Sequence, residues 1–183
     1  MIENLLTQPL FLCGMMGSGK STIGKTLSEK LSVPFHDLDS LIEKKSGKSI
    51  PEIFENEGEE SFRQTEKELI IQLAQTAEGV IALGGGTLQN QQITDHVKLN
   101  GWLVFLDCKP DTLYNRLKDS SNRPMISSLS KENLKLKITT LLNDRLEFYK
   151  QAHFSVECDD RDIDAILEDL IQKLKFYEQK YTG

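Results

Sequence analysis

A glycine-rich segment near the start of the chain carries the most specific chemistry in this sequence. Residues Gly14–Ser21 read Gly-Met-Met-Gly-Ser-Gly-Lys-Ser and match the phosphate-binding pattern G-x-x-x-x-G-K-[ST]. Its glycines let consecutive backbone N–H groups turn toward phosphate oxygens, and the positive end of a following helix favours the anion. Lys20 would reach the β- and γ-phosphates, and the Ser21 hydroxyl would ligate Mg²⁺. The pattern arises by chance in about one chain of this composition in a hundred, so we expect a site for ATP and Mg²⁺.

The predicted nucleotide site consists of this loop and the first residues of the helix after it. Its members are Gly14, Met15, Met16, Gly17, Ser18, Gly19, Lys20, Ser21 and Thr22. The loop alone does not identify what is phosphorylated, because GTPases, motors and small-molecule kinases all share it. The acceptor has to be inferred from other residues.

Two carboxylates follow a second, shorter apolar run. Asp37 and Asp39 stand at the end of a predicted strand, and ligands gather at the carboxyl ends of strands in open α/β sheets. Residues at i and i+2 on an extended segment point the same way. One carboxylate could support Mg²⁺ through its water shell, while the other accepts a proton or a hydrogen bond from an acceptor hydroxyl. The alternative is that Asp39 only caps the helix that follows.

Two further segments have compositions that suit a ligand site. Gly84-Gly85-Gly86 follows a third apolar run; a triple glycine is usually a flexible turn, but at the end of a buried strand it lets a ligand approach the backbone. The polar stretch 119–130 follows neither the helical nor the strand period and contains Pro124. Such a stretch is either a lid over a site or a disordered surface loop.

Strands alternating with helices would have to position these residues. The apolar runs predict strands at Leu10–Cys13, Val33–His36, Val80–Leu83, Trp102–Leu106 and Phe154–Cys158. Apolar positions at helical spacing predict helices at Lys20–Leu31, Glu59–Ala77, Asp111–Asp119, Lys131–Gln151 and Asp162–Lys180. The alternation predicts a parallel sheet covered by helices on both faces, and the length of 183 residues suits one domain spanning 1–183.

Composition and charge narrow the classes of partner. The net charge of -6 makes a broad surface for nucleic acid or an anionic membrane improbable, and no apolar run approaches the roughly 18 to 20 residues that span a bilayer. Met1–Pro9 has no basic region followed by an apolar stretch, so a cytoplasmic protein without a secretory signal is expected. Neither the three cysteines nor the three histidines have metal-ligand spacing, and the cysteines are interpreted as small buried hydrophobes.

The motifs, taken in order, resemble those of shikimate kinases from about Leu10 to Tyr149. The resemblance rests on the glycine-rich loop, Asp37-Leu38-Asp39, Phe62-Arg63-x-x-Glu66, the triple glycine, Arg123-Pro124 and Asp144-Arg145-x-x-x-Tyr149. It implies a P-loop, nucleoside-monophosphate-kinase-like fold: a three-layer α/β/α sandwich with five parallel strands in the order 2-3-1-4-5. It also implies a mobile lid at about 119–130 and a substrate-binding helical region at about 37–66. We expect a monomer.

The resemblance further implies roles for individual residues. Shikimate would be held by Asp39, Arg63, Arg145 and the backbone of Gly84, Gly85 and Gly86. Arg123 would close on the transferring phosphoryl group with Lys20, Arg116 would stack on adenine, and Ser21 and Asp37 would support the metal. Shikimate suits this set, because its carboxylate matches two guanidinium groups and its hydroxyls match an aspartate. Only five of the 22 basic residues are Arg, and four of them fall on these positions.

Several features are less decisive. Val80–Leu83 runs into glycine without the acidic residue that many P-loop enzymes carry there, which is typical of shikimate kinases and leaves Asp37 to support the metal. Phe54 could pack beside the substrate ring or in the core, and Arg161 could contact adenine or belong to a solvated charge cluster. Two rival functions remain: a gluconate or nucleoside monophosphate kinase on the same scaffold, and a nucleotide-dependent binding module without catalysis.

Overall fold

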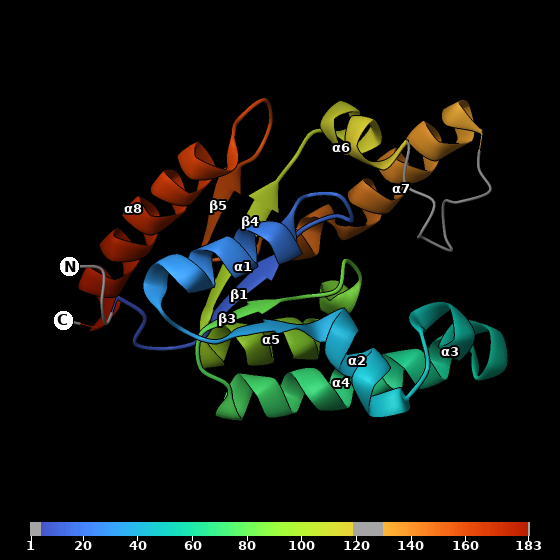
Figure 1. Cartoon of the computed structure of the whole chain (residues 1–183), viewed down its shortest axis with the longest axis horizontal. Helices are drawn as coiled ribbons and strands as arrows, with labels where there is room; N and C mark the ends of the chain where they lie inside the picture. Colours follow the sequence, from blue (N-terminus) through green and yellow to red (C-terminus); the bar gives the residue numbers. More distant parts are fainter. Residues whose placement is uncertain (1–4, 119–129, 183) are drawn as a thin grey trace.

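The computed structural model describes residues 5–118 and 130–182 and contains one five-stranded parallel sheet (Figure 1). Its strands are β1 (Leu10–Cys13), β2 (Phe35–Asp37), β3 (Val80–Ala82), β4 (Trp102–Asp107) and β5 (Phe154–Glu157). They lie in the order β2-β3-β1-β4-β5, and every pairing is parallel. The predicted fold class and strand order are therefore confirmed.

Helices cover both faces of this sheet. The helices of the described residues are α1 (Lys20–Leu31), α2 (Leu38–Ser46), α3 (Ile50–Asn56), α4 (Gly58–Thr76), α5 (Gln91–Asn100), α6 (Pro110–Leu117), α7 (Lys131–Tyr149) and α8 (Ile163–Thr182), with a 3-10 turn η1 (Thr87–Gln89). In Figure 1, α1 lies beside α8 on one face, and α4 pairs with α5 on the other. Every residue of β1 and β3 is buried, as expected for strands covered on both faces.

The register brings the glycine-rich loop, the triple glycine and the two aspartates to one edge of the sheet. β1 is central and pairs with β3 through Leu12 and Ala82 and with β4 through Cys13 and Phe105. Because the strands are parallel, their carboxyl ends share an edge, and the glycine-rich loop leaves β1 there. The triple glycine after β3 and the aspartates around α2 reach the same edge.

The second strand begins later than its apolar run suggested. Val33 continues the end of α1 instead: Ser32 adopts a left-handed conformation, with φ 55°, and the Val33 N–H donates to the Ser28 carbonyl at 3.0 Å. This capping turn satisfies carbonyls at the helix end that would otherwise lack a donor. The strand therefore spans Phe35–Asp37, although a strand was predicted at Val33–His36.

Three helices and η1 were not predicted from the periodicity. The helices α2, α3 and α5 have nine, seven and ten residues. Their ends are nevertheless marked by caps. The Asp37 side chain caps α2, a Ser49–Glu52 capping box opens α3, and Asn90 caps α5.

Within 5–118 and 130–182, no helix is long and apolar enough to cross a membrane. In the same residues, no group of three or more His, Cys, Asp or Glu side chains could hold a metal ion by itself.

A buried carboxylate ties the start of the chain to the last helix. Glu178 on α8 is 6% exposed and accepts hydrogen bonds from Trp102 Nε1 at 2.8 Å, Thr7 N at 3.1 Å and Thr7 Oγ1 at 2.6 Å. Trp102 itself opens β4 and is buried, as the sequence suggested. Glu178 therefore satisfies donors from two distant segments.

Replacing Glu178 by Ala is expected to lower the free energy of unfolding by about 1–3 kcal/mol, because the buried indole N–H would lose its acceptor. Glu168→Ala, an exposed position on the same helix, is the matched control and should change it by less than about 0.5 kcal/mol. Urea unfolding of both variants measures the difference. Equal midpoints for the two variants would contradict this role of Glu178.

Candidate active site

The glycine-rich loop folds into a cradle that side chains would fill. Gly14 has φ 142°, and a Cβ there would lie 2.8 Å from the Leu106 carbonyl oxygen. Gly19, with φ 94°, stands at the left-handed position immediately before α1. The loop is closed by a hydrogen bond from Ser18 N to the Met15 carbonyl at 3.1 Å. This geometry leaves backbone N–H groups and the N-terminus of α1 at the surface of one hollow.

Two side chains of the loop are arranged as a phosphate site requires. Lys20 Nζ donates to the Gly14 and Met15 carbonyl oxygens at 2.8 and 3.0 Å, so the ammonium group lies over the loop. Ser18 Oγ is buried and has no hydrogen-bond partner among the described residues. Buried hydroxyls normally have a hydrogen-bond partner, and a phosphate oxygen bound in the cradle would provide one for Ser18.

A hydroxyl and a carboxylate meet beside the cradle. Ser21 Oγ donates to Asp37 Oδ2 at 2.6 Å, while Asp37 Oδ1 accepts from Ser40 N at 3.3 Å at the start of α2. Hydroxyl and carboxylate oxygens are the ligands that Mg²⁺ accepts, usually with several waters retained. These two residues are therefore the pair that could hold Mg²⁺ next to a bound triphosphate.

The cradle opens into a cavity of about 440 Å³. Its lining consists of Met16, Gly17, Ser18, Gly19, Lys20, Ser21, Thr22, Ile23, Asp37, Asp39, Leu83, Gly85, Arg116, Arg161, Ile163 and Ile166. The cavity thus joins the predicted nucleotide residues to both aspartates and to the triple glycine. A second hollow, of about 470 Å³, is lined by Arg63, Glu66 and Gly86 among others, so the triple glycine lies between the two.

Arg116 contacts the backbone of the cradle. Its Nη1 donates to the Gly17 and Ser18 carbonyl oxygens at 3.3 and 3.4 Å, and its Nη2 donates to the Cys158 carbonyl at 2.9 Å. It therefore links the loop after β1 to the segment after β5. This position lines the cavity, as the predicted adenine contact requires.

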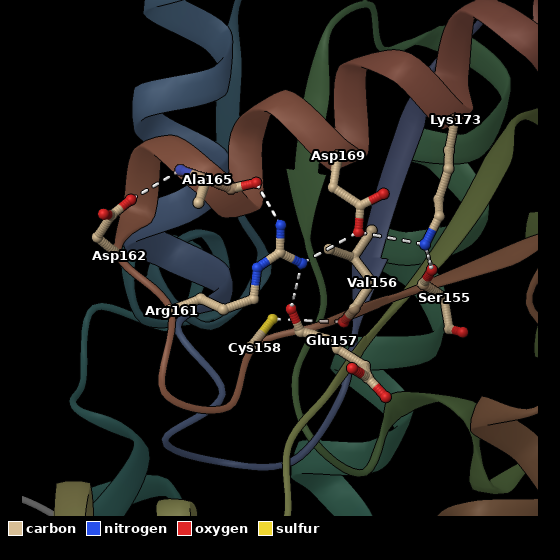
Figure 2. A network of polar contacts seen from close by, with 9 residues as sticks. All are labelled: Ser155, Val156, Glu157, Cys158, Arg161, Asp162, Ala165, Asp169 and Lys173. Carbon is tan, nitrogen blue, oxygen red and sulfur yellow. Dashed lines mark hydrogen bonds and ion pairs between the residues drawn. The ribbon is translucent and has the colours of Figure 1, made fainter.

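Arg161 is held in a network between β5 and α8 (Figure 2). Its Nη1 donates to the Glu157 carbonyl and Asp169 Oδ2, both at 3.1 Å, and its Nη2 donates to the Ala165 carbonyl at 2.6 Å. Lys173 also contacts Asp169, at 3.2 Å. The side chain is half-buried and lines the cavity beside the glycine-rich loop, so it belongs to a fixed network at the edge of that cavity.

The triple glycine is the meeting point of the predicted substrate residues. A Cβ on Gly84 would lie 3.0 Å from Asp39 Oδ1, and one on Gly86 would lie 2.9 Å from Arg63 Nη2. A Cβ on Gly85 would lie 3.3 Å from Arg145 Nη1. The three polar side chains come from α2, α4 and α7, yet each reaches a different glycine of the same turn. The lack of side chains at these three glycines leaves room for Asp39, Arg63 and Arg145.

One premise about the aspartates is wrong. Asp37 and Asp39 were expected on one extended segment, but Asp37 ends β2 and caps α2, whereas Asp39 lies in the first turn of that helix. The chain turns into a helix here because the Asp37 carboxylate offers Ser40 N an acceptor. Both carboxylates still line the cavity, with Asp37 facing Ser21 and Asp39 facing Gly84.

Arg63 is positioned by acidic neighbours on its own helix. Its Nη1 contacts Glu66 Oε2 at 2.7 Å, and its Nη2 contacts Glu59 at 3.3 Å. Glu66 is only 2% exposed and accepts a second hydrogen bond, from Thr87 Oγ1 at 2.6 Å. Burial alone would lower the pKa of Arg63, but the two glutamates outweigh it and raise the pKa, so the guanidinium stays charged.

Arg145 differs from Arg63 because the side chains that it contacts among the described residues are neutral. It is 5% exposed, its Nε donates to Gln89 Oε1 at 3.1 Å, and its Nη1 approaches Met15 Sδ at 3.8 Å. Within the part of the chain that the structure describes, it forms no ion pair with a carboxylate. A buried cation without a counter-charge is costly, and an anionic ligand beside it would remove that cost.

Comparison with known proteins identifies the family. A sequence model of the family described as shikimate kinase matches residues 16–175. The chain belongs to the shikimate kinase family. A relative named shikimate kinase, from Chlorobium limicola, is 42% identical over 170 residues, which cover 90% of this chain and 85% of that protein.

Solved structures of shikimate kinases superpose on most of the chain. The enzyme from Bacteroides thetaiotaomicron gives a TM-score of 0.87 at 34% identity, covering 92% of this chain and 98% of that one. A shikimate kinase from Acinetobacter baumannii in complex with shikimate gives 0.82 at 32% identity, with 96% of both chains covered. A gluconokinase from Sinorhizobium meliloti gives 0.64 at 18% identity, which shows a shared fold only.

The predicted lid lies almost entirely outside the described residues, and the sequence allows two interpretations of Phe54. Arg123 and all but the last residue of the predicted lid at 119–130 lie outside the described residues. Phe54 packs against Phe62 with ring centroids 4.9 Å apart and contacts the core, which favours the interpretation as a packing aromatic.

The structure adds residues that the sequence did not single out. Gln89 and Thr87, in η1, contact Arg145 and Glu66, and Tyr149 OH donates to the Gly85 carbonyl at 2.5 Å. No pattern marks residues 87–89, because a 3-10 turn is too short to have a period. The i, i+4 spacing of Arg145 and Tyr149 does predict a shared helix face, and both side chains indeed reach Gly85.

Proposed function

We propose that this protein transfers the γ-phosphoryl group of ATP to the 3-hydroxyl of shikimate, which gives shikimate 3-phosphate and ADP. The observation that carries the proposal is Arg145: a buried guanidinium without a carboxylate partner among the described residues, at the turn where Asp39 and Arg63 also converge. A bound carboxylate next to Arg145 would supply the missing counter-charge. The shikimate complex of the Acinetobacter relative supports the choice of acceptor.

We propose that shikimate binds along the triple glycine. Its carboxylate would lie between Arg145 and Arg63, and its hydroxyls would face Asp39 and the backbone of the turn. Glu66 and Thr87 would hold Arg63 in place, and Gln89 would do the same for Arg145. Acceptor and nucleotide would then share the cavity that Asp39 and Gly85 line.

The triphosphate of ATP would occupy the cradle formed by Gly14–Thr22, with Arg116 beside the adenine end. Lys20 would exchange its two backbone acceptors for phosphate oxygens. Ser21 and Asp37 would hold Mg²⁺, which would neutralise negative charge on the triphosphate when bound.

In the transfer step Asp39 would orient the 3-hydroxyl and accept its proton as the oxygen forms a bond to the γ-phosphorus. The bond from that phosphorus to the bridging oxygen of ADP breaks, and its electron pair stays with ADP. Lys20 and Arg123 would stabilise the charge on the equatorial oxygens of the transferring group. Positioning and electrostatics thus account for most of the catalysis.

We also propose that residues 1–183 form one kinase domain that works as a monomer in the cytoplasm, without nucleic-acid or membrane partners. The net charge of -6 gives no broad attraction to either kind of anionic surface. Light scattering tests the assembly state: a molar mass of one chain would support the monomer, and twice that mass would contradict it.

The acceptor is tested by ADP release from ATP and Mg²⁺ in separate reactions with shikimate, gluconate, AMP or no acceptor. Shikimate alone is expected to stimulate release, because only this acceptor would match the arginines and the aspartate together. Stimulation by gluconate or AMP instead would retain phosphoryl transfer and reject the shikimate site. ADP release that no acceptor stimulates would favour a binding module.

A further inference from the structure

Two buried thiols face each other beneath the nucleotide cradle. Cys108 follows β4 and Cys158 follows β5, and the parallel register that pairs Asp107 with Glu157 places them opposite each other. Cys158 N donates to the Asp107 carbonyl at 2.9 Å, so the ladder continues to this pair. The two residues are 3% and 0% exposed. They are far apart in sequence but adjacent at the carboxyl edge of the sheet.

The backbone spacing of this pair suits a disulfide. Neighbouring strands lie about 4.8 Å apart, and disulfides join Cα atoms about 4.4–6.8 Å apart. The Cys158 thiol is within hydrogen-bonding reach of the Cys108 sulfur. It also donates to the Val156 carbonyl at 3.4 Å, a contact that Figure 2 draws as a dashed line. Little backbone movement is therefore needed to join the two sulfurs.

The surroundings make the two thiols chemically unequal. The hydrogen bond from Cys158 and the Arg116 guanidinium, whose Nη1 lies 3.6 Å from Cys108 Sγ, hold the pKa of Cys108 below its ordinary value despite burial. The same hydrogen bond and burial raise the pKa of Cys158. By contrast, burial raises the pKa of Cys13 to about 12. Cys108 is thus the nucleophile, because the thiolate is the reactive form, and Cys13 is the natural internal control.

We propose that Cys108 and Cys158 form a reversible redox site whose disulfide weakens nucleotide binding. The oxidant is a hydroperoxide. The Cys108 thiolate attacks one peroxide oxygen, which gives a sulfenic acid and water or an alcohol, and the Cys158 thiol then displaces the sulfenic oxygen as water. The two thiols lose two electrons and two protons to the peroxide in total, and a dithiol reductant restores them.

The disulfide would affect the cradle because the Cys108 thiol and Arg116 both contact its backbone. The Cys108 thiol approaches the Ser18 carbonyl at 3.8 Å, and Arg116 contacts both that carbonyl and Cys108 Sγ. Oxidation removes the thiol proton and the partial negative charge that Arg116 faces. Losing one or two such contacts at Gly17 and Ser18 should weaken ATP binding about two- to tenfold. Shikimate contacts, on the other side of the cavity, should be less affected.

The chemical step is tested by treating the purified protein with hydrogen peroxide and mapping its peptides by mass spectrometry without reduction. A crosslinked peptide pair containing Cys108 and Cys158, lost after dithiothreitol, is the expected result. The Cys13→Ala variant should give the same pair, and Cys158→Ala should leave Cys108 as a sulfenic or higher acid. A wild-type protein in which Cys108 and Cys158 stay reduced while methionines oxidise would overturn the proposal.

The functional step is tested by measuring the dissociation constant for ATP before and after peroxide, with no acceptor present. The constant should rise two- to tenfold in wild type and in Cys13→Ala and return with dithiothreitol, whereas Cys158→Ala should not show this reversible change. Formation of the disulfide with no change in the constant would reject its effect on the cradle. Because neither readout involves shikimate, both are independent of the proposed acceptor.

Discussion

Replacing Asp39 by Asn is expected to lower kcat by about 10²–10⁴-fold, because the amide cannot accept the proton of the 3-hydroxyl. The KM for shikimate should change far less, since Asn keeps the size of Asp and can still hydrogen bond to a hydroxyl. Asp39 lies beside Gly84 and lines the cavity with Lys20 and Ser21, so its carboxylate faces both reactants in the proposed complex. Steady-state rates at saturating ATP and Mg²⁺, with shikimate varied, separate the two parameters.

The matched control for this variant is Asp95→Asn. Asp95 is an exposed aspartate on α5 whose carboxylate accepts from Gln91, away from the cavity. It should keep both kcat and KM. If Asp39→Asn retained the wild-type kcat, Asp39 would be excluded from proton transfer, and a raised KM with normal kcat would leave it only the role of binding shikimate.

The sheet could be predicted from the sequence because its strands are short runs of apolar residues with few alternatives. β1, β3 and β4 are buried on both faces. The run Leu10–Cys13 is accordingly apolar throughout, and Trp102–Asp107 is apolar in every residue except Asp107. Their alternation with helices restricts the topology to a parallel sheet with crossovers. The strand order itself came from the resemblance to shikimate kinases.

Local details could not be predicted, since they depend on capping rather than on periodicity. Val33 looked like part of a strand, but the turn at Ser32 uses its N–H to end α1. Asp37 and Asp39 looked alike, yet the Asp37 carboxylate accepts from Ser40 N and thereby starts a helix that carries Asp39. Which of several possible hydrogen bonds forms at such a position depends on the surrounding fold.

The convergence on the triple glycine is a tertiary property. Asp39, Arg63 and Arg145 come from helices that are distant in sequence, and nothing local indicates that each reaches a different glycine. The supporting contacts of Gln89, Thr87 and Tyr149 are likewise visible only once the helices are packed. The motif residues could therefore be named in advance, but the residues that position them could not.

Replacing Arg145 by Met is expected to have opposite effects on shikimate binding and on the stability of the free protein. A shikimate carboxylate facing Met in the closed site would lose its buried counter-charge, which typically costs about 2–5 kcal/mol, so KM should rise about 30- to 5,000-fold. In the free protein, however, Arg145 is buried beside Gln89 and Met15 without an ion-pair partner among the described residues. Removing that charge relieves its desolvation cost, and the urea midpoint should not fall.

This pair of results would distinguish a ligand-binding arginine from a structural one. If the arginine served the fold, its replacement would destabilise the protein, as the loss of one partner of a buried ion pair does. Lys137→Met, at an exposed position on the same helix, is the control and should leave both KM and the midpoint unchanged. A normal KM together with a lowered midpoint in Arg145→Met would remove Arg145 from the shikimate site. A raised KM with an unchanged midpoint would mean that the buried Arg145 binds the substrate and does not stabilise the free protein. Its burial would then cost stability in the free protein, and substrate binding would offset that cost.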